Sequence, residues 1–229
     1  MKRESFLANI RHQLESAYLP DAQLQKPAPP APLDHSQDAQ EAQEKLVEQF
    51  SKEVIALSGE VYHANSEADV YEQILDIFAQ KGATEFIAWH DEYLPIADLN
   101  ARLIAFGHTK RDLDIPNEPE TRHNTHLGLS DVGIGLTSAM AALSDTGSLV
   151  VQCGVGRSRL ASLLPPVHIA VLKKDQLLPS MAHFIQAYPN AAKETSNLVF
   201  VTGASRTADI EQTLTLGVHG PKELHVILV

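Results

Sequence analysis

The stretch from Asp131 to Lys173 constrains the fold of this chain more than any other. It places an Asp-Thr-Gly turn (Asp145–Gly147) between two apolar runs, followed by a glycine loop with two arginines, a Pro-Pro pair and a last apolar run. Short apolar runs bounded by glycine, proline and polar clusters are typical of buried strands. Glycines and arginines at strand ends are typical of anion pockets in α/β proteins. The stretch therefore predicts a buried sheet and marks where to look for a site.

The rest of the chain alternates helices with short apolar strands. This alternation predicts a three-layer α/β fold, with a mostly parallel sheet covered on both faces. Residues 138–144 are rich in alanine and are compatible with a helical turn, but a β-hairpin near residues 138–152 is favoured. Helices are expected at 39–57, 66–82, 94–100, 176–188 and 209–216, and further strands at 60–64, 84–89, 102–106, 197–202 and 224–229.

The domain organisation follows from a change in composition near the N-terminus. Residues 1–18 have apolar side chains at helical spacing and predict a short amphipathic helix. Residues 19–38 contain five prolines among alanine and glutamine, which predicts an extended linker. Residues 39–229 then form a single α/β domain. The first helix packs either on this domain or on a partner. Residues 109–126 are polar and irregular, as in a surface excursion or a lid.

Charge and cysteine content exclude some classes of function. The chain has 29 acidic and 18 basic side chains and a net charge of −11, which argues against nonspecific nucleic-acid binding. Its one cysteine, Cys153, excludes an internal disulfide and an iron–sulfur cluster held by this chain alone. No apolar run reaches the ~18–20 residues of a membrane span, and the N-terminus has no secretory core. We expect a soluble cytoplasmic protein, with Cys153 as a small buried hydrophobe at the start of a loop.

The first candidate site is the segment Gly203-Ala204-Ser205-Arg206-Thr207-Ala208-Asp209, which follows the predicted strand 197–202. A strand that enters a glycine turn and then a helix presents free backbone N–H groups to an anion. The hydroxyls of Ser205 and Thr207 and the guanidinium of Arg206 suit a carboxylate or a phosphate. Alternatively, a hydroxyl caps the helix while Arg206 pairs with a nearby acid. The spacing of a P-loop is absent.

Two further candidates lie before the last strand and in the central stretch. His219, flanked by glycines in 217–221, is able to present an imidazole of near-neutral pKa at a strand end, although a turn histidine that only bonds backbone fits the pattern too. The third candidate combines Asp145–Ser148 with Arg157 and Arg159. The two arginines suit recognition of a carboxylate or phosphate, or are solvated at the surface.

Two classes of site receive no support from the sequence. None of the 11 histidines forms an HxxxH or HExxH motif, and His123 and His126 share a loop without an obvious third ligand. We therefore expect no metal site. A GxSxG elbow is also absent, which argues against serine hydrolase chemistry.

Four segments resemble the lactate-utilization protein C family, the stand-alone members of the LUD-domain group. The combination is specific, although each segment alone would be weak evidence. The family commonly has Ala-Glu-Thr-Gly-Thr where this chain has Ser144–Ser148, and a proline where Ala204 stands; these departures bear on fine specificity more than on the assignment. The matching segments are 132–137 (VGIGLT), 141–150 (AALSDTGSLV), 162–169 (SLLPPVHI) and 201–211 (VTGASRTADIE) through 217–221 (GVHGP).

The resemblance implies a fold like that of the NagB/RpiA/CoA-transferase group. It also implies a role in oxidising L-lactate to pyruvate with two partner proteins that carry iron–sulfur clusters. Because this chain has a single cysteine, the clusters would lie in those partners, and no cofactor is expected on the chain itself. The resemblance assigns no catalytic residues, and it leaves open whether the chain is an enzyme within an iron–sulfur L-lactate dehydrogenase complex.

Residue types at predicted strand ends suggest one small-carboxylate pocket. In this hypothesis Arg157 and Arg206 clamp the carboxylate, and His219, with Asp145 near it, accepts the proton of the lactate hydroxyl. Two other functions stay open: a non-catalytic assembly subunit of the same system, and a stand-alone enzyme acting on a sugar acid or acyl-CoA. The expected substrate-binding residues are Thr146, Gly147, Ser148, Arg157, Arg159, Gly203, Ser205, Arg206 and Thr207.

Overall fold

The computed structural model describes residues 39–113, 128–129, 131–207, 215–216 and 220–229, together with four helical residues near the N-terminus (Ser5, Leu7, Ala8 and His12). The chain divides into two compact units, Met1–Ala31 and Pro32–Val229. The predicted linker at 19–38 lies outside the described residues, as do most of the predicted N-terminal helix and most of the irregular segment 109–126.

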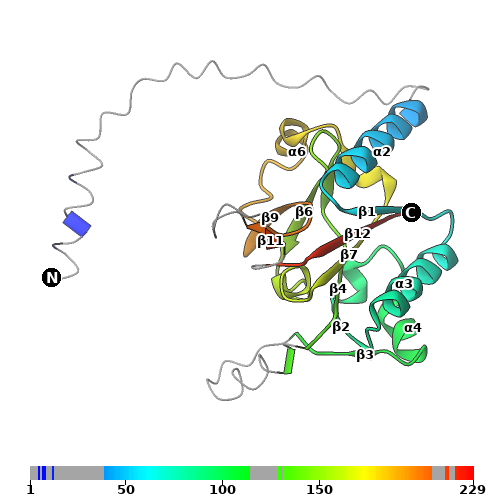
Figure 1. Ribbon diagram of the computed structural model, residues 1–229. Helices are drawn as coiled ribbons and strands as arrows, with labels where there is room; N and C mark the ends of the chain where they lie inside the picture. The colour runs from blue at the N-terminus through cyan, green and yellow to red at the C-terminus, as the bar shows by residue number, and fades with distance from the viewer. Residues whose placement is uncertain are drawn as a thin grey trace. The chain divides into compact units, whose positions relative to one another are not determined.

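The second unit is built on a six-stranded sheet in the order β1-β12-β7-β4-β2-β3, in which every pairing is parallel (Figure 1). The carboxyl ends of all six strands therefore meet at one edge of the sheet. This arrangement confirms the predicted α/β class with a mostly parallel sheet. The strands are β1 (Glu60–His63), β2 (Glu85–Ala88), β3 (Thr109–Lys110), β4 (Ile134–Thr137), β7 (Val167–Leu172) and β12 (Glu223–Leu228).

The helices begin and end where the local chemistry requires. In α3 (Glu67–Lys81), the Ser66 side chain accepts a hydrogen bond from the Asp69 N–H, and Gly82 ends the helix in the left-handed conformation with φ of 60°. Ile74 and Ile77 are among the α3 side chains that are buried against the core. The other helices are α2 (Ala39–Ala56), α4 (Leu99–Ala105) and α6 (Met181–Ala187), with 3₁₀ turns η1 (Asp91–Tyr93), η2 (Arg159–Ser162) and η3 (Lys174–Gln176).

A second sheet contains the predicted β-hairpin. Its order is β8-β5-β6-β9, and β5 and β6 pair antiparallel across the Asp-Thr-Gly turn, with Leu143 opposite Ser148. Gly147 has φ of 62°, which a residue with a side chain adopts only at a cost. The hairpin is thus confirmed, but it belongs to a separate four-stranded sheet. The strands are β5 (Ala141–Leu143), β6 (Ser148–Cys153), β8 (Leu177–Leu178) and β9 (Asn197–Thr202).

Two predictions for the middle of the chain are wrong. Residues 102–106 are not a strand, and the helix predicted at 94–100 matches α4 only at residues 99 and 100; the third strand in chain order is β3. Leu99 and Leu103 are buried on one side of α4 while Ile104 is exposed, so the consecutive apolar residues belong to a helical face. Short apolar runs do not distinguish a strand from a helix by periodicity.

The predicted helix at 176–188 is correct only from Met181 onward. Leu177 and Leu178 form strand β8, because the residue before a proline, here Pro179, is pushed out of the helical region. Leu177 pairs with Ala142 of β5 and adds an edge to the second sheet.

The predicted helix at 209–216 is contradicted at its end. Thr215–Leu216 is a strand (β11) that pairs antiparallel with β10 (Arg206–Thr207). We expected residues 203–209 to lead from a strand through a turn into a helix. The turn instead leads into strand β10, which begins at Arg206. The β-branched threonines in both segments favour extended backbone. Residues 208–214 lie outside the described part of the chain.

Glycine in the middle of β4 lets a backbone segment contact the sheet directly. A Cβ added at Gly135 would overlap the carbonyl oxygen of Ala161 in η2. Because that neighbour is backbone, it has little freedom to move aside. We expect Gly135→Ala to lower the free energy of unfolding by at least about 2 kcal/mol. Urea unfolding measures this, and Gly128→Ala, where a Cβ meets nothing within 4 Å, is the matched control. Equal stabilities of the two variants would contradict the contact.

A buried histidine in β7 predicts a loss of stability in acid. His168 is fully buried, its Nε2 lies 2.8 Å from Thr137 Oγ1, and burial lowers its pKa from 6.5 to about 4. The unfolded chain therefore binds this proton at a higher pH than the folded chain does. The contribution of His168 to the free energy of unfolding is fully present above pH 6.5. It is lost as the pH drops toward 4, and the loss is on the order of 3 kcal/mol. In His168→Gln, urea unfolding measured at several pH values should show a smaller fall over that range; an unchanged fall would refute the assignment.

Candidate functional site

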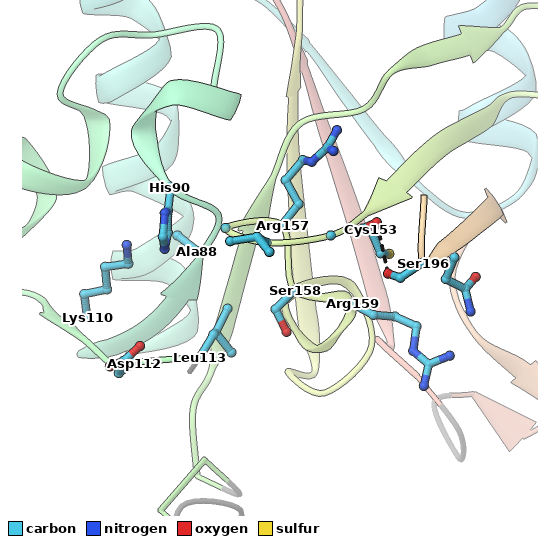
Figure 2. Close-up of a pocket in the computed structure, with 14 residues that line it drawn as sticks. Ala88, His90, Lys110, Asp112, Leu113, Cys153, Arg157, Ser158, Arg159 and Ser196 are labelled. Carbon is cyan, nitrogen blue, oxygen red and sulfur yellow. Dashed lines mark hydrogen bonds between the residues drawn. The ribbon is translucent and has the colours of Figure 1, made fainter. Parts of the chain in front are cut away.

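A cavity of about 500 Å³ opens at the carboxyl ends of β2 and β3 (Figure 2). In open α/β sheets, ligands bind in the crevice outside the carboxyl ends of the strands. The position and the size therefore both fit a small-molecule site. The cavity is lined by Ala88, His90, Lys110, Asp112 and Leu113 after the two strands, by residues 153–159 after β6, and by Ser196 and Asn197 at the start of β9.

The loop after β6 forms one wall through a tight turn. Gly154 and Arg157 exchange both backbone hydrogen bonds, at 3.1 and 3.0 Å, and Gly156 between them has φ of 71°. A Cβ at Gly156 would lie 2.9 Å from both the His90 Nδ1 and the Tyr93 ring. Only glycine lets the backbone approach this closely. The His90 N–H donates to the Gly156 carbonyl at 2.9 Å, which ties the turn to the end of β2.

The chain's single tryptophan holds the same loop from the core side. Trp89 is buried, and its indole N–H donates to the Ser158 carbonyl at 3.1 Å. The Asn100 side chain in turn donates to the Trp89 carbonyl at 2.9 Å, and the Asn100 N–H donates to an Asp91 carboxylate oxygen at 2.9 Å. These bonds fix the backbone on both sides of His90, so that the wall of the cavity is preorganised.

Two cationic side chains reach the cavity from different elements. Lys110 at the end of β3 is half-buried, and burial lowers the pKa of its ammonium, although Asp91 and Asp112 oppose the shift. Arg159 follows the turn and is exposed. Figure 2 shows Lys110 on the His90 side of the cavity and Arg159 on the side of Cys153 and Ser196. The pair places a cation at each end of the cavity, with the Asp112 carboxylate also in the lining on the Lys110 side.

Arg157 lines the cavity but is held by protein contacts. Its Nη1 donates to the Gln152 side chain at 2.6 Å, and its guanidinium carbon lies 4.6 Å from the centre of the Tyr93 ring. Figure 2 shows the guanidinium turned away from Lys110 and Arg159. Its Nε is buried without a hydrogen-bond partner among the described residues. These contacts stiffen the turn, whereas Arg159 is the freer of the two arginines.

Cys153 contributes a neutral wall. Burial raises the pKa of its thiol, against the opposing effect of Arg159 and Arg157. Its carbonyl accepts hydrogen bonds from the hydroxyls of Thr195 and, at 3.1 Å, Ser196. The cysteine is thus a small buried residue at the start of a loop, as the sequence predicted.

The Asp145–Ser148 turn lies at the other end of β6. Since β6 has six residues, the turn and the Arg157 loop are separated by about 17 Å. The Ser148 hydroxyl bonds the Thr146 hydroxyl at 2.9 Å and the Thr202 hydroxyl at 2.8 Å. A Cβ at Gly147 would lie 2.8 Å from the backbone nitrogen of Val54 in α2. The turn therefore packs on α2.

The segment that begins at Gly203 also lies at the end of α2. Arg206 Nη2 donates to the Leu57 carbonyl and to the Ser58 hydroxyl, both at 2.7 Å. The guanidinium thus caps the carboxyl end of α2, a position that favours a cation. The Ser205 N–H donates to the Pro221 carbonyl at 2.8 Å. This part of the predicted site is occupied by structural contacts.

The structure thus divides the predicted pocket into two groups. Arg157 and Arg159 belong to the cavity, whereas Asp145–Ser148, Gly203, Ser205 and Arg206 gather near the end of α2. Thr207 lies in β10, and its side chain is outside the described part. The predicted proton acceptor, His219, also lies outside the described residues.

Sequence reasoning missed two residues of the cavity, His90 and Lys110. His90 directly follows the strand predicted at 84–89, so its place at a carboxyl end was a usable signal. Lys110 was hidden because the third strand was predicted at 102–106, before the true strand. Gly107 follows α4, and a short strand that ends in a charged residue comes shortly after it. That pattern is the signal that would have identified Lys110.

One group of potential metal ligands lies at the opposite edge of the main sheet. Within the described ranges, a ligand atom from each of Glu60, Glu223 and His225 lies within 4.8 Å of the others. Glu60 begins β1 and Glu223 begins β12, so this group is at the amino edge, away from the cavity. The expectation that the chain binds no cofactor remains a prediction.

No helix in the described part of the chain combines the length and the apolar character needed to cross a lipid bilayer.

Comparison with known proteins places the chain in a family. The LUD domain model matches residues 47–229. Lactate utilization protein C of Halalkalibacterium halodurans is 28% identical over 243 residues, which cover 100% of this chain and 97% of the relative. The protein of the same name from Geobacillus sp. (strain WCH70) is 27% identical over 167 residues, covering 70% and 68%.

A solved structure supports the fold independently. The crystal structure of a DUF162 family protein from Deinococcus radiodurans superposes with a TM-score of 0.60 at 22% identity, over 82% of this chain and 98% of that one. At this identity the likeness bears on the fold alone. Together with the family match over most of the chain, it leads to one conclusion: the chain belongs to the LUD domain family.

Proposed function

We propose that this chain is a cytoplasmic subunit of a lactate-utilization system and binds a small carboxylate in the cavity beside β2 and β3. The names of its relatives support the system, since Lactate utilization protein C of H. halodurans aligns with the whole chain. The observation that supports an anionic ligand is the position of Lys110. Its ammonium group is half-buried in a cavity at the carboxyl edge of a parallel sheet. A half-buried cation in such a cavity favours an anionic ligand.

The other groups of the cavity suit a hydroxy acid. Arg159 offers planar donors to a carboxylate, and the half-buried Ser158 is a further polar group in the lining. His90 offers an imidazole beside the turn and is the proton acceptor that the described cavity provides for a hydroxyl. The predicted acceptor His219 remains the alternative, and it lies outside the described residues.

Lactate oxidation also needs an electron acceptor outside this chain. Conversion of L-lactate to pyruvate releases two electrons and two protons. We assign the electrons to two iron–sulfur partner proteins, as the family resemblance implies, because a single buried cysteine cannot hold a cluster. This chain would bind the substrate and accept the hydroxyl proton, while the proton from the α carbon passes to solvent as the two electrons pass to the partners.

A second function, assembly without catalysis, is favoured by one surface. Ile185 of α6, Tyr188 directly after it and Phe200 of β9 are exposed, and the rings of Tyr188 and Phe200 both contact Phe184. Exposed apolar side chains that gather in one place mark interaction surfaces. In Ile185→Glu, loss of partner co-purification with unchanged ligand binding would favour assembly over binding.

Trp89 is a built-in reporter of ligand binding, because its indole bonds the wall of the cavity. We expect L-lactate, added to the purified chain, to change Trp89 fluorescence in a saturable way. Lys110→Met should weaken binding at least ~10-fold, since a hydrogen bond to a charged group contributes about 1.5–3 kcal/mol. Lys52→Met, an exposed lysine on α2, is the matched control.

Two results would contradict this location. One is the absence of a saturable change in Trp89 fluorescence with lactate, with another hydroxy acid and with pyruvate. The other is a loss of affinity in Arg206→Ala equal to that expected for Lys110→Met, which would support the carboxylate clamp predicted at Arg206. From the contacts of Arg206 with Leu57 and Ser58, we expect that variant to lose stability instead.

Binding should also depend on pH through Lys110. Because burial lowers the pKa of its ammonium, Lys110 loses its charge at a lower pH than an exposed lysine does. The affinity for lactate, which stays anionic, should therefore fall as the pH rises through that pKa. Fluorescence titrations at increasing pH measure the fall, and Lys110→Arg, which stays charged, should abolish it. The same decline in Lys110→Arg would assign the titration to another group.

A further inference from the structure

We propose that Glu60, Glu223 and His225 form a binding site for a divalent transition-metal ion such as Zn²⁺. The site lies at the amino edge of the main sheet and is independent of the proposed function. It rests on the register of two neighbouring strands and on a count of hydrogens. The short contacts between their side chains need one more hydrogen than the neutral groups carry.

Strand register brings the three side chains together. Glu60 of β1 and His225 of β12 are direct partners in the parallel pair. Glu223 stands two residues before His225 and therefore points to the same face of the sheet. One ligand atom from each of the three residues lies within 4.8 Å of the others. Imidazole and carboxylate groups are ordinary zinc ligands.

The imidazole is buried and held on both sides. His225 is 1% exposed, and its ring stacks on the Tyr62 ring with centroids 5.9 Å apart. Its Nδ1 lies 3.1 Å from the Tyr62 hydroxyl oxygen, and its Nε2 lies 3.2 Å from Glu223 Oε2. The Tyr62 hydroxyl donates to Glu60 Oε2 at 2.6 Å. The ring is therefore fixed between a tyrosine and a carboxylate.

These three short contacts need three hydrogens, and the neutral groups supply two. The Tyr62 hydroxyl gives its hydrogen to Glu60, and a neutral imidazole carries one N–H. In the tautomer with Nδ1–H toward the Tyr62 oxygen, the lone pair of His225 Nε2 faces the carboxylate of Glu223 at 3.2 Å; in the other tautomer, Nε2–H donates to Glu223 and the Nδ1 lone pair faces the Tyr62 oxygen at 3.1 Å. Two electron-pair donors at that distance repel unless a cation lies between them. In metal sites, too, the second ring nitrogen of the histidine donates to an oxygen.

The distance between the two donors suits a transition metal. A nitrogen and an oxygen 3.2 Å apart both reach one ion at about 2.1 Å with an angle near ~100° at the metal, close to tetrahedral or octahedral values. Glu60 is 58% exposed in its side chain, so that it can offer a carboxylate oxygen as a third ligand in addition to the one bonded by the Tyr62 hydroxyl. Water would complete the shell.

The Lys81 ammonium competes with a metal ion for the Glu223 carboxylate. Its Nζ lies 2.5 Å from Glu223 Oε2. The Glu223 carboxylate therefore already holds a cation at this place. A metal ion must displace the ammonium, which lies at the end of α3 and is partly exposed. Removing Lys81 should therefore strengthen metal binding.

Calorimetric titration of the chelator-treated full-length chain with Zn²⁺ tests the site. Glu223→Gln, which changes a half-exposed group and should preserve the fold, is expected to weaken one binding event at least ~10-fold, as is His225→Gln. Lys81→Met should tighten the same event. His183→Ala on α6 is the control, because it removes a histidine far along the chain from the two strands. Unchanged Zn²⁺ affinity in Glu223→Gln would overturn the proposal.

A second measurement separates a metal from a proton. Nitrogen NMR of the imidazoles should show Zn²⁺ shifting the Nε2 signal of His225 while Nδ1 stays protonated. If both nitrogens carry protons and Zn²⁺ leaves their signals unchanged, the third hydrogen is a proton and the cluster is an imidazolium network without a metal site. Either result is decisive even where His225→Gln fails to fold.

Discussion

The contact between the loop after β6 and the end of the parallel sheet is the constraint on which the rest of the structure depends. Glycine makes it possible at two points: Gly156 admits the rings of His90 and Tyr93, and Gly135 admits the backbone of η2. The bond from Trp89 to the Ser158 carbonyl fixes the same loop. Because this loop connects β6 of the second sheet to β7 of the first, the cavity beside it has walls from both sheets. The site is thus a consequence of how two sheets are fastened together.

The sequence predicted the frame of the fold better than its site. The strand predicted at 84–89 was found because its burial in the middle of the sheet leaves a continuous apolar run after Gly82. The run at 102–106 has the same composition but lies in a helix, and only the three-dimensional surroundings of Leu103 distinguish the two cases. That single error also concealed Lys110, since a residue is recognised as a site candidate only when its strand end is placed correctly.

The division of the predicted pocket has a physical reason of the same kind. Glycine and arginine at a strand end serve equally to bind an anion and to pack against a helix terminus, because both present a negative partial charge to the guanidinium. Arg206 meets the carbonyl of Leu57 at the end of α2, whereas Arg159 reaches a cavity. Residue type and spacing are the same in both cases. What differs is the strand that each loop follows, β9 for Arg206 and β6 for Arg159, and the sequence does not reveal what lies at the end of each strand.

The main sheet presents different chemistry at its two edges. At the carboxyl edge, Lys110 and Arg159 provide local positive charge on a chain with a net charge of −11. At the amino edge, two carboxylates surround a buried imidazole. Strands of four to six residues keep the edges roughly 13–20 Å apart, so an ion bound at one cannot touch a ligand at the other. Since β1 is an outermost strand of the sheet, a metal shared by Glu60 and His225 would fasten that strand to β12. Its effect would therefore be on the stability of the sheet edge, and the ligand cavity would keep its affinity with or without the ion.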